Sequence, residues 1–493
     1  MAPSKKIEEL KLFFHPDTLA IVGASKSFRK WGAIVLHNTL LGGYKGKIYP
    51  INPKADEIFG LAVYPSLVDV PEPVDLAVIV VPPDKVLDTL MDAKEAGVSA
   101  CVLITAGFSE TGDLGKELEL EIVRYAGENG IRLIGPNCLG MVSMVPKMLA
   151  AWMPSYVPKP GVVSILSQSG NLCYTLIRAL NGRGLGVCRS ISSGNEADLM
   201  AQDFLDYLAD DEDTKVILSY IEGVSDGRAF INSLKVAVLK KPVVVLKSGH
   251  TEAGSRAGAS HTGAMTGSDD LYDAVFSQTG AVRAVGIEEM EDLAVVFSTQ
   301  PVPKGNRVGI LTMGGGWGVL AADACAEEGL SVVKLTAETK SDLNKFLPSW
   351  WSRGNPVDTV AGLKDDDLFN SLEVLLSAEY IDSIMILGVG YGSVRGSAIK
   401  NSPYSHLYNM AEIGQHYING DEVIAENIID LLKKHKKPII PVVDQAVVGD
   451  RGSFVEILKG SGVLPFTSPR RGAVALSALT RYGEYRRKLY GGG

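Results

Sequence analysis

The sequence has 493 residues, of which 46% are hydrophobic and 21% charged, a composition typical of a soluble globular protein of about three domains. Its net charge of −9 argues against nucleic acid as the main partner, although a local basic pocket for a phosphorylated ligand is compatible with it. No apolar run reaches membrane-helix length, no signal-peptide pattern begins the chain, and five scattered cysteines fit a reducing cytoplasm without a metal site.

Continuous apolar strands alternate with helical stretches over the first 145 residues. Such alternation predicts a parallel, doubly wound α/β sheet, whose ligands bind at the carboxyl ends of the strands. The strands are expected at 18–24, 46–53, 74–83, 100–107 and 132–137, with helices at 84–97 and 115–130. The polar and turn residues at the strand ends are Gly23, Ser25, Lys26, Asn52, Lys54, Pro82, Pro83, Thr105, Pro136 and Asn137.

The first strand ends in a glycine turn at 23–32 that is not a full GxGxxG motif. The second strand ends near Lys54 rather than near an acid, which suits a phosphate better than the ribose diol of NAD. Lys26, Arg29, Lys30 and Lys54 together suit an adenosine phosphate such as that of coenzyme A. The alternative is that these side chains are simply solvated cations on loops. For Lys26 or Lys30 taken alone, this alternative is favoured.

A proline-dotted segment at 143–160 is expected to be the first interdomain crossing, followed by a strand, Ser-Gln-Ser-Gly and a helix. Ser167, Ser169 and Gly170 would lie at the helix start, where free N–H groups and the helix dipole form an anion site. Ordinary helix capping is the alternative. Glu222 ends a later strand and could orient an imidazole, unless it is simply a solvent-exposed strand end.

The small-residue stretch 254–267 contains a single histidine, His261, and predicts a loop. An imidazole titrates near neutrality and can act as a nucleophile, so this residue could carry a group between two sites. An incidental histidine on a surface loop is the interpretation that this segment alone favours.

After a linker at 299–306, the third unit opens with a strand, three glycines and a helix. Gly314, Gly315 and Gly316 at the helix entrance are typical of a phosphate cradle, and the GK[ST] ending of a P-loop is missing. Residues 355–358 are expected in a loop, 395–420 as an irregular insertion, and the basic C-terminal segment as a helix with a frayed tail.

Cys138 is expected to be a small buried side chain that fills space in the core, rather than a reactive thiol.

Taken in order, these motifs resemble the alpha subunit of NDP-forming acyl-CoA synthetases, the ADP-forming acetate–CoA ligase group related to succinyl-CoA synthetase. The resemblance covers roughly residues 12–480. It rests on VGAS at 22–25, INPK at 51–54, VVPP at 80–83, IGPNCLG at 134–140, SQSGNL at 167–172, SSGNEADL at 192–199, YIEGV at 220–224, SHTGA at 260–264, GGGWG at 314–318 and NPVD at 355–358. Trp317 departs from the smaller residues common in the family, and either narrows an acyl pocket or packs.

The resemblance implies a Rossmann-like CoA-binding domain at 1–145 and two flavodoxin-like, succinyl-CoA-synthetase-type domains, at 146–298 and 307–493. In such an enzyme His261 is phosphorylated and Glu222 orients it. The implied phosphate-binding residues are Ser167, Gln168, Ser169, Gly170, Gly314, Gly315 and Gly316. The implied CoA-binding residues are Gly23, Ser25, Lys54, Pro82, Pro83, Thr105 and Asn137.

The implied reaction is reversible: acyl-CoA, ADP and phosphate give acid, CoA and ATP through acyl phosphate and phosphohistidine. No segment is left over for an ATP-grasp module, so ADP/ATP and Mg²⁺ are expected on a separate beta subunit in an α2β2 complex. Substrates from acetate to aromatic or dicarboxylic acids are compatible, and the partner would decide between ADP and GDP. The alternative is a non-catalytic, CoA-binding regulatory protein of the same fold, in which loss of His261 or Glu222 would be expected.

Overall fold

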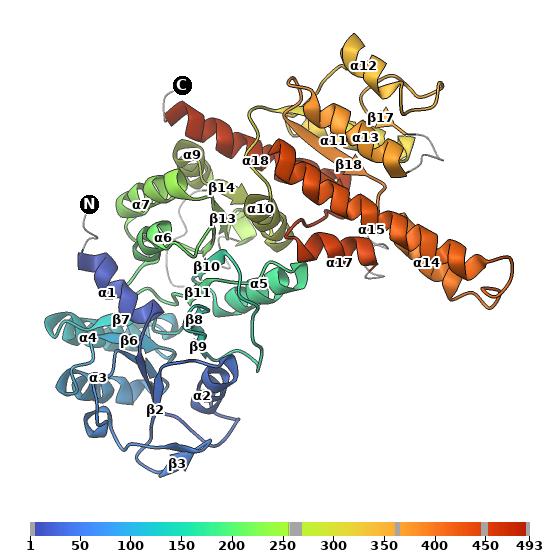
Figure 1. Ribbon diagram of the computed structural model, residues 1–493. Helices are drawn as coiled ribbons and strands as arrows, with labels where there is room; N and C mark the ends of the chain where they lie inside the picture. The colour runs from blue at the N-terminus through green and yellow to red at the C-terminus, as the bar shows by residue number, and fades with distance from the viewer. Residues whose placement is uncertain (1–4, 255, 257–268, 360–364, 445–451, 490–493) are drawn as a thin grey trace. The chain divides into compact units, whose positions relative to one another are not determined.

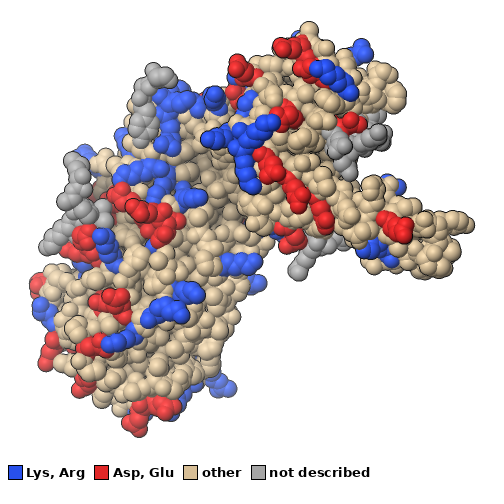
Figure 2. Space-filling model, in the orientation of Figure 1, with Lys and Arg blue, Asp and Glu red and all other residues tan. Residues whose placement is uncertain are grey.

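The computed structural model describes residues 5–254, 256, 269–359, 365–444 and 452–489 (Figure 1). The chain forms two compact units that divide between Met290 and Glu291, within helix α10 (Ile287–Thr299). Among the described helices, none is long and apolar enough to cross a membrane. Basic and acidic side chains are interspersed on the face of the units drawn in Figure 2, as the mixed charge of the sequence predicts.

The first sheet has five parallel strands in the order β2-β1-β5-β6-β7, and all five coincide with predicted strands. Their bounds are Thr18–Val22 (β1), Lys47–Ile51 (β2), Leu76–Ile79 (β5), Ala100–Leu103 (β6) and Arg132–Ile134 (β7). Helix α2 (Trp31–Gly42) covers one face, and α3 (Val86–Glu95) and α4 (Asp113–Glu128) cover the other (Figure 1). The strand order reverses between β1 and β5, which is where doubly wound sheets bind ligands.

The second sheet has seven strands in the order β14-β13-β12-β10-β11-β8-β9. Its parallel strands are β10 (Val163–Ser167), β11 (Arg189–Ser192), β12 (Val216–Ile221), β13 (Val243–Lys247) and β14 (Val282–Ala284). Helices α5 (Gly170–Arg183), α6 (Ala201–Asp210), α7 (Gly227–Lys240) and α9 (Asp269–Thr279) follow successive strands. The first described helix, α1 (Lys5–Phe14), was not predicted; its Phe14 stacks on Tyr207 of α6 at 4.1 Å between ring centroids.

The segment predicted as an interdomain crossing, 143–160, also contributes to this sheet. Strands β8 (Gly140–Ser143) and β9 (Met148–Ala151) form an antiparallel hairpin, and β8 pairs with β11. All four residues of β9 are buried, because α2 packs on this strand and Asn38 donates hydrogen bonds to the Ala151 and Met153 carbonyls. A helix of the first sheet thus packs against the second.

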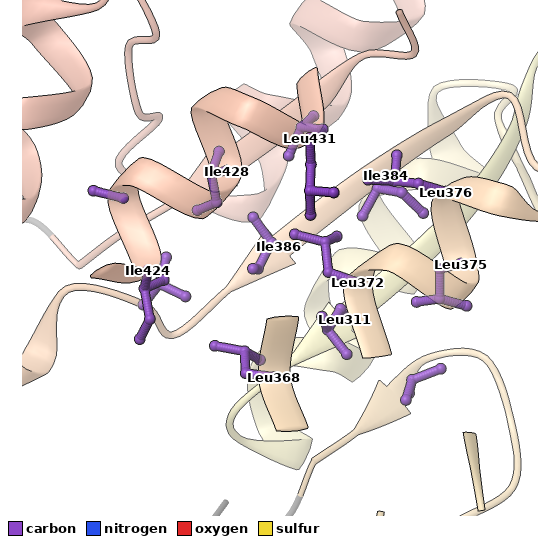
Figure 3. Packing of buried hydrophobic residues seen from close by; sticks show 14 of the residues in the cluster. Leu311, Leu368, Leu372, Leu375, Leu376, Ile384, Ile386, Ile424, Ile428 and Leu431 are labelled. Atoms are coloured by element: carbon purple, nitrogen blue, oxygen red, sulfur yellow. The ribbon is translucent and has the colours of Figure 1, made fainter. Parts of the chain in front are cut away.

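The second unit has a parallel sheet in the order β16-β15-β18-β19, with the short strand β17 also paired to β15. The strands are Arg307–Thr312 (β15), Ser331–Val332 (β16), Val357–Asp358 (β17), Ser383–Leu387 (β18) and Ile439–Val442 (β19). The helices are α11 (Gly315–Glu327), α12 (Ala337–Leu343), α13 (Asp365–Ser377), α14 (Tyr391–Lys400), α15 (Met410–His435), α17 (Ser453–Gly460) and α18 (Pro469–Leu489). Figure 3 shows leucines of α13 and isoleucines of α15 packed on β15 and β18.

Two predictions for this unit were wrong. Residues 355–358 are not all loop, because Val357 and Asp358 pair with β15. Residues 395–420 are not irregular: they lie mostly in α14 and α15, which form a helical hairpin (Figure 1). The two helices touch through glycines, since a Cβ on Gly396 would lie 2.3 Å from the Gly414 carbonyl oxygen. A contact made by glycines leaves no apolar stripe in the sequence.

Candidate functional site

A cleft of about 840 Å³ opens at the carboxyl edge of the first sheet, where the strand order reverses. Loops that follow β1, β2, β5 and β6 line it. Six of the seven residues predicted to bind CoA are part of this lining: Gly23, Ser25, Lys54, Pro82, Pro83 and Thr105. Asn137 is not in the lining and lies beyond Thr105, to whose carbonyl its backbone N–H donates a 2.8 Å hydrogen bond.

Glycines allow the first turn to approach its neighbours closely. Gly23 has a φ of 88°, and a Cβ on it would lie 2.3 Å from the Val80 carbonyl oxygen after β5. A Cβ on Gly32, in the first turn of α2, would lie 2.1 Å from the Gly23 carbonyl oxygen. The turn therefore brings the N-terminus of α2 directly to the cleft, where its free backbone N–H groups favour an anion.

Hydrogen bonds between the loops hold the cleft open. The Asn52 amide donates to the Ala24 carbonyl at 2.7 Å, and the Lys54 backbone N–H donates to Asn52 Oδ1 at 2.9 Å. The Thr105 hydroxyl donates to the Val81 carbonyl at 2.7 Å. The first and last of these bonds join loops of neighbouring strands and the second braces the loop after β2, so the site is largely pre-formed.

The cleft has an excess of positive charge. Arg29, Lys30 and Lys54 line it, and among the described residues no carboxylate lies within ion-pair distance of them. Lys85, also in the lining, is 3.3 Å from Asp88, and Lys26 is not a lining residue. Cationic side chains beside a helix N-terminus suit a phosphorylated ligand.

A second group of predicted residues gathers at the start of α5, beyond β10. The Ser167 hydroxyl donates to the Ser169 carbonyl at 2.7 Å and accepts from the Ser169 N–H at 3.2 Å. The Ser169 side chain accepts from the Leu172 N–H at 3.5 Å and thereby caps α5, as the capping alternative requires. The cap uses one N–H group, and the remaining N–H groups of the first turn are those an anion would meet.

Glu222 lies beside this loop and is held there by Gln168. The Gln168 carbonyl oxygen accepts hydrogen bonds from the N–H groups of Glu222 at 2.5 Å and Gly223 at 3.1 Å, while its amide donates to the Gly223 carbonyl at 2.8 Å. The hydroxyl of Tyr220, whose pKa is raised mainly by burial, bonds the Glu222 carboxylate. Glu222 is therefore a positioned group and not merely an exposed strand end.

His261 lies outside the described residues. On the described chain before it, β13 ends at Lys247, which is only 2% exposed and was not predicted. Its ammonium lies 4.8 Å from the Tyr272 ring centroid, and burial, more than any neighbouring charge, lowers its pKa. A single lysine at the end of the apolar run Val-Val-Val-Leu-Lys was the available sign in the sequence.

The loop at 312–316 in the second unit repeats the geometry of the loop at 167–170. The Thr312 hydroxyl donates to the Gly314 carbonyl at 2.8 Å and accepts from the Gly314 N–H at 3.2 Å. The N-cap residue of α11 is Gly314, which has no side chain to cap it, and Gly315 and Gly316 are exposed at the helix start. Asp358 stands at this entrance, since its Oδ2 would lie 2.9 Å from a Cβ on Gly315. Trp317 is half-buried in the first turn.

Two further predictions concern the reactivity of Cys138 and metal binding. Cys138 is buried, and burial raises the pKa of its thiol to about 12, which favours the filler interpretation. In the described part of the chain, no group of three or more His, Cys, Asp or Glu side chains could hold a metal ion.

Three family models match the chain in succession. Residues 17–144 match a CoA binding domain, residues 160–297 a succinyl-CoA ligase like flavodoxin domain, and residues 308–397 a ligase-CoA domain. The cleft thus lies in the CoA binding domain, and the loops at 167–170 and 312–316 lie in the second and third matches.

Relatives match over the whole chain. The alpha subunit of ADP-forming acetate–CoA ligase II from Pyrococcus furiosus is 38% identical over 98% of this chain and 99% of its own. An ADP-forming acetate–CoA ligase from Methanocaldococcus jannaschii is 44% identical over 71% of this chain, which spans about half (49%) of that relative. The dinucleotide-forming acetyl-coenzyme A synthetase 1 of Ca. Korarchaeum cryptofilum, solved with phosphate and ADP, is 35% identical, with a TM-score of 0.85 and 98% of each chain covered. The chain therefore belongs to the family of ADP-forming acetate–CoA ligase alpha subunits, acid–thiol ligases of the succinyl-CoA synthetase superfamily.

Proposed function

We propose that this chain is the alpha subunit of an ADP-forming acid–CoA ligase, which interconverts acyl-CoA, ADP and phosphate with acid, CoA and ATP. The observation that carries the proposal is a continuous path from the cleft to the loop at 167–170. Thr105 of the cleft bonds Asn137, and the Asn137 amide donates to Asn195 Oδ1 at 3.2 Å. Ser193, two residues before Asn195, donates its backbone N–H to the Ser167 carbonyl at 2.9 Å.

In this proposal the cleft binds CoA. Arg29, Lys30, Lys54 and the start of α2 would hold its phosphates, and Gly23, Ser25, Pro82, Pro83 and Thr105 would shape the wall. Asn137 would lie toward the thiol end, since it leads from the cleft to the second sheet. The cationic lining, and the position of Lys54 rather than an acid at the end of β2, favour CoA over NAD.

The loop at 167–170 would hold the phosphoryl group during acyl transfer. Phosphate attacks the thioester carbonyl, the C–S bond breaks and CoA leaves as the thiolate, which gives acyl phosphate. A nitrogen of His261 then attacks phosphorus, the P–O bond to the acyl group breaks and the acid leaves. Glu222 would orient the imidazole and stabilise its positive charge, while backbone N–H groups hold the phosphoryl oxygens. The loop at 312–316 in the second unit would offer a phosphoryl group the same kind of backbone N–H donors.

The nucleotide half of the reaction would take place on a partner. We propose an ATP-grasp beta subunit that binds ADP or ATP with Mg²⁺, in an α2β2 complex. The support is the length of the relatives: this chain spans 99% of a relative named as an alpha subunit but about half of two relatives named as ligases without mention of a subunit. A small carboxylic acid would be the substrate, as in the named activities of these relatives. A non-catalytic CoA-binding protein is not favoured, because His261 and Glu222 are present.

The experiment is to incubate the purified full-length chain with acetyl phosphate and to measure acid-labile phosphate by mass spectrometry. We expect one phosphoryl group on His261, and none in His261→Ala. His250→Ala is the matched control, since His250 is an exposed histidine outside the proposed site, and it should be labelled like the unmodified chain. Equal labelling of His261→Ala would refute the proposal.

A second experiment tests the proposal that the nucleotide half of the reaction requires a partner subunit. The purified chain, free of any partner, is given acetyl-CoA, phosphate, ADP and Mg²⁺. We expect release of CoA but no steady formation of ATP. Sustained ATP formation by the chain alone would contradict the proposal that a partner subunit binds the nucleotide.

A further inference from the structure

The buried carboxyl of Glu196 lies behind the loop at 167–170 and has no part in the mechanism above. It follows β11 in the motif at 192–199 and is only 9% exposed. Its backbone φ of 54° is in the left-handed region, which side-chain-bearing residues seldom adopt. Such a conformation persists where surrounding contacts impose it, often at functional sites.

Three hydrogen-bond donors converge on this carboxyl. The Ser193 hydroxyl donates to Glu196 Oε1 at 2.7 Å, and the Gln168 side chain and the Ala201 backbone N–H also bond the carboxyl. An ionised carboxylate accepts several hydrogen bonds at once, whereas a protonated one must donate its own proton. Burial nevertheless raises the pKa of Glu196 to about 7, more than these bonds lower it.

Gln168 connects the carboxyl of Glu196 to the turn that contains Glu222. Its amide group is shared between Glu196 and the Gly223 carbonyl, and its carbonyl oxygen accepts the N–H groups of Glu222 and Gly223. An amide can rotate by half a turn and exchange its oxygen and nitrogen. A carboxylate that accepts from the nitrogen reinforces the orientation that the backbone of Glu222 and Gly223 selects, in which the side-chain oxygen of Gln168 faces the Glu222 turn.

We propose that Glu196 is a positioning residue for phosphoryl transfer, which acts through Gln168 to hold Glu222 beside the N-terminus of α5. The inference rests on the proposed function. Capping of α6 is a separate task of Asp203, whose Oδ2 accepts the Met200 N–H at 2.9 Å. Of the titratable groups around Glu196, Asp203 on α6 opposes its ionisation, and Glu222 lies beyond Gln168.

The test compares Glu196→Gln with Asp203→Asn in the full-length chain, using acetyl phosphate as the phosphoryl donor. In Glu196→Gln the new amide nitrogen would face one of the three donors, so the orientation of Gln168 loses one of its supports. We expect about a tenfold lower rate of labelling, the size of one lost buried hydrogen bond of roughly 1.4 kcal/mol. The dissociation constant for CoA should stay within about twofold, which also shows that the variant is folded. Asp203→Asn should lose stability but keep the labelling rate.

The pH profile distinguishes positioning from simple structural support. Labelling of the unmodified chain requires neutral His261 and ionised Glu196, so the rate should rise with pH and depend on two protons below pH 6. In Glu196→Gln the dependence should fall to one proton. Glu196→Asp, which keeps the charge on a shorter side chain, should be intermediate in rate and keep the two-proton dependence.

The possible results distinguish failure of the role of Glu196 from failure of the proposed function. An unchanged rate and pH dependence in Glu196→Gln, or an equal loss of rate in Asp203→Asn, would overturn the role of Glu196. If Glu196→Gln does not bind CoA, Glu196→Asp decides: a one-proton dependence there overturns the role as well. Absence of acid-labile phosphate in the unmodified chain would overturn the proposed function and this inference with it.

Discussion

The loops at 167–170 and 312–316 have the same backbone geometry but different surroundings. In both, a Ser or Thr hydroxyl at the strand end bonds the residue two positions on, and a helix begins immediately afterwards. In the first loop the next residue is Gln168, which bonds Glu222, Gly223 and Glu196; in the second it is Met313, which is 41% exposed. The backbone creates the potential anion site in each loop, and the first loop adds a network of side chains centred on Gln168.

The helix starts differ in the same sense. Ser169 caps α5 with its side chain, whereas Gly314 leaves α11 without a side-chain cap. One turn later Cys173 is buried in α5, while Gly318 occupies the corresponding place in α11. A Cβ on Gly318 would lie 2.9 Å from Thr312 Cγ2 and 3.1 Å from Pro356 Cβ, so α11 packs closer to its strand than a side chain would allow. The second loop therefore depends on glycine where the first depends on polar side chains.

The largest effect is expected when the first loop is made like the second. Gln168→Met removes the bonds that Gln168 makes to the part-buried Glu222 and Gly223 and to the buried Glu196. We expect unfolding to become easier by about 2–4 kcal/mol and labelling by acetyl phosphate to slow at least 100-fold. The matched control is Met313→Gln, an exposed position, which should change stability by less than about 0.5 kcal/mol. Urea denaturation and labelling rates measure both; equal effects of the two variants would contradict the asymmetry.

Glu196, which belongs to the first loop only, should make stability depend on pH. Its pKa of about 7 in the folded chain lies above the value of about 4.3 expected for an unfolded glutamate. The folded state therefore holds more protons than the unfolded state between these values, and stability falls as pH rises from about 4.3 to 7. Compared with Glu196→Gln, the unmodified chain should lose up to roughly 3 kcal/mol between pH 4.5 and 8. A parallel pH dependence of the two proteins in denaturant titrations would refute this.

Gly318→Ala should test the packing on which the second loop depends. The added methyl group meets Thr312 and Pro356 in a buried place, and we expect a loss of about 1–3 kcal/mol. Gly316→Ala, two residues earlier in the same helix, meets nothing within 4 Å and should stabilise α11 by up to about 1 kcal/mol. Thermal unfolding of the two variants provides the comparison; equal midpoints would show that α11 does not need the close approach.

The smallest effect concerns the cleft, where side-chain charges accompany the backbone donors. Lys54→Ala should weaken CoA binding only about two- to fivefold, because Lys54 is exposed and exposed ion pairs contribute up to about 1 kcal/mol. The weakening should shrink at high salt. Lys26→Ala, outside the cleft lining, should leave the affinity unchanged. Calorimetry with CoA measures both, and equal losses would mean that net charge, and not the cleft, attracts the ligand.

Much of the fold could be predicted because strands buried on both faces are continuous apolar runs. The five strands of the first sheet, and β10, β12 and β15 of the other two, lie where these runs indicated. Strand β9 was missed because Met148–Ala151 is short and surrounded by prolines, and its burial comes from Asn38 and α2 over 100 residues away. The α14–α15 hairpin was missed because glycines, rather than apolar side chains, make its contact.

The candidate site also contains residues that could be predicted from the sequence and residues that could not. Residues at strand ends were predictable as a group, because parallel strands bring their carboxyl ends to one edge, and six of the predicted residues do line one cleft. Their roles in binding CoA or phosphate stay predictions. Lys247 and Glu196 were not singled out, because nothing in the adjacent sequence shows that an ammonium or a carboxyl there is buried.

The sequence by itself therefore determined the positions of the main apolar strands, the two glycine- or serine-containing helix entrances and the polar strand ends, since each depends on neighbouring residues. Tertiary structure alone decided that Asn137 reaches Asn195 and that Gln168 stands between Glu196 and Glu222. These contacts join residues 28 to 58 positions apart, counted from 168 to 196 and from 137 to 195. The physical reason is that hydrogen bonds and burial depend on distance in space, which is set only when the sheets have formed and packed.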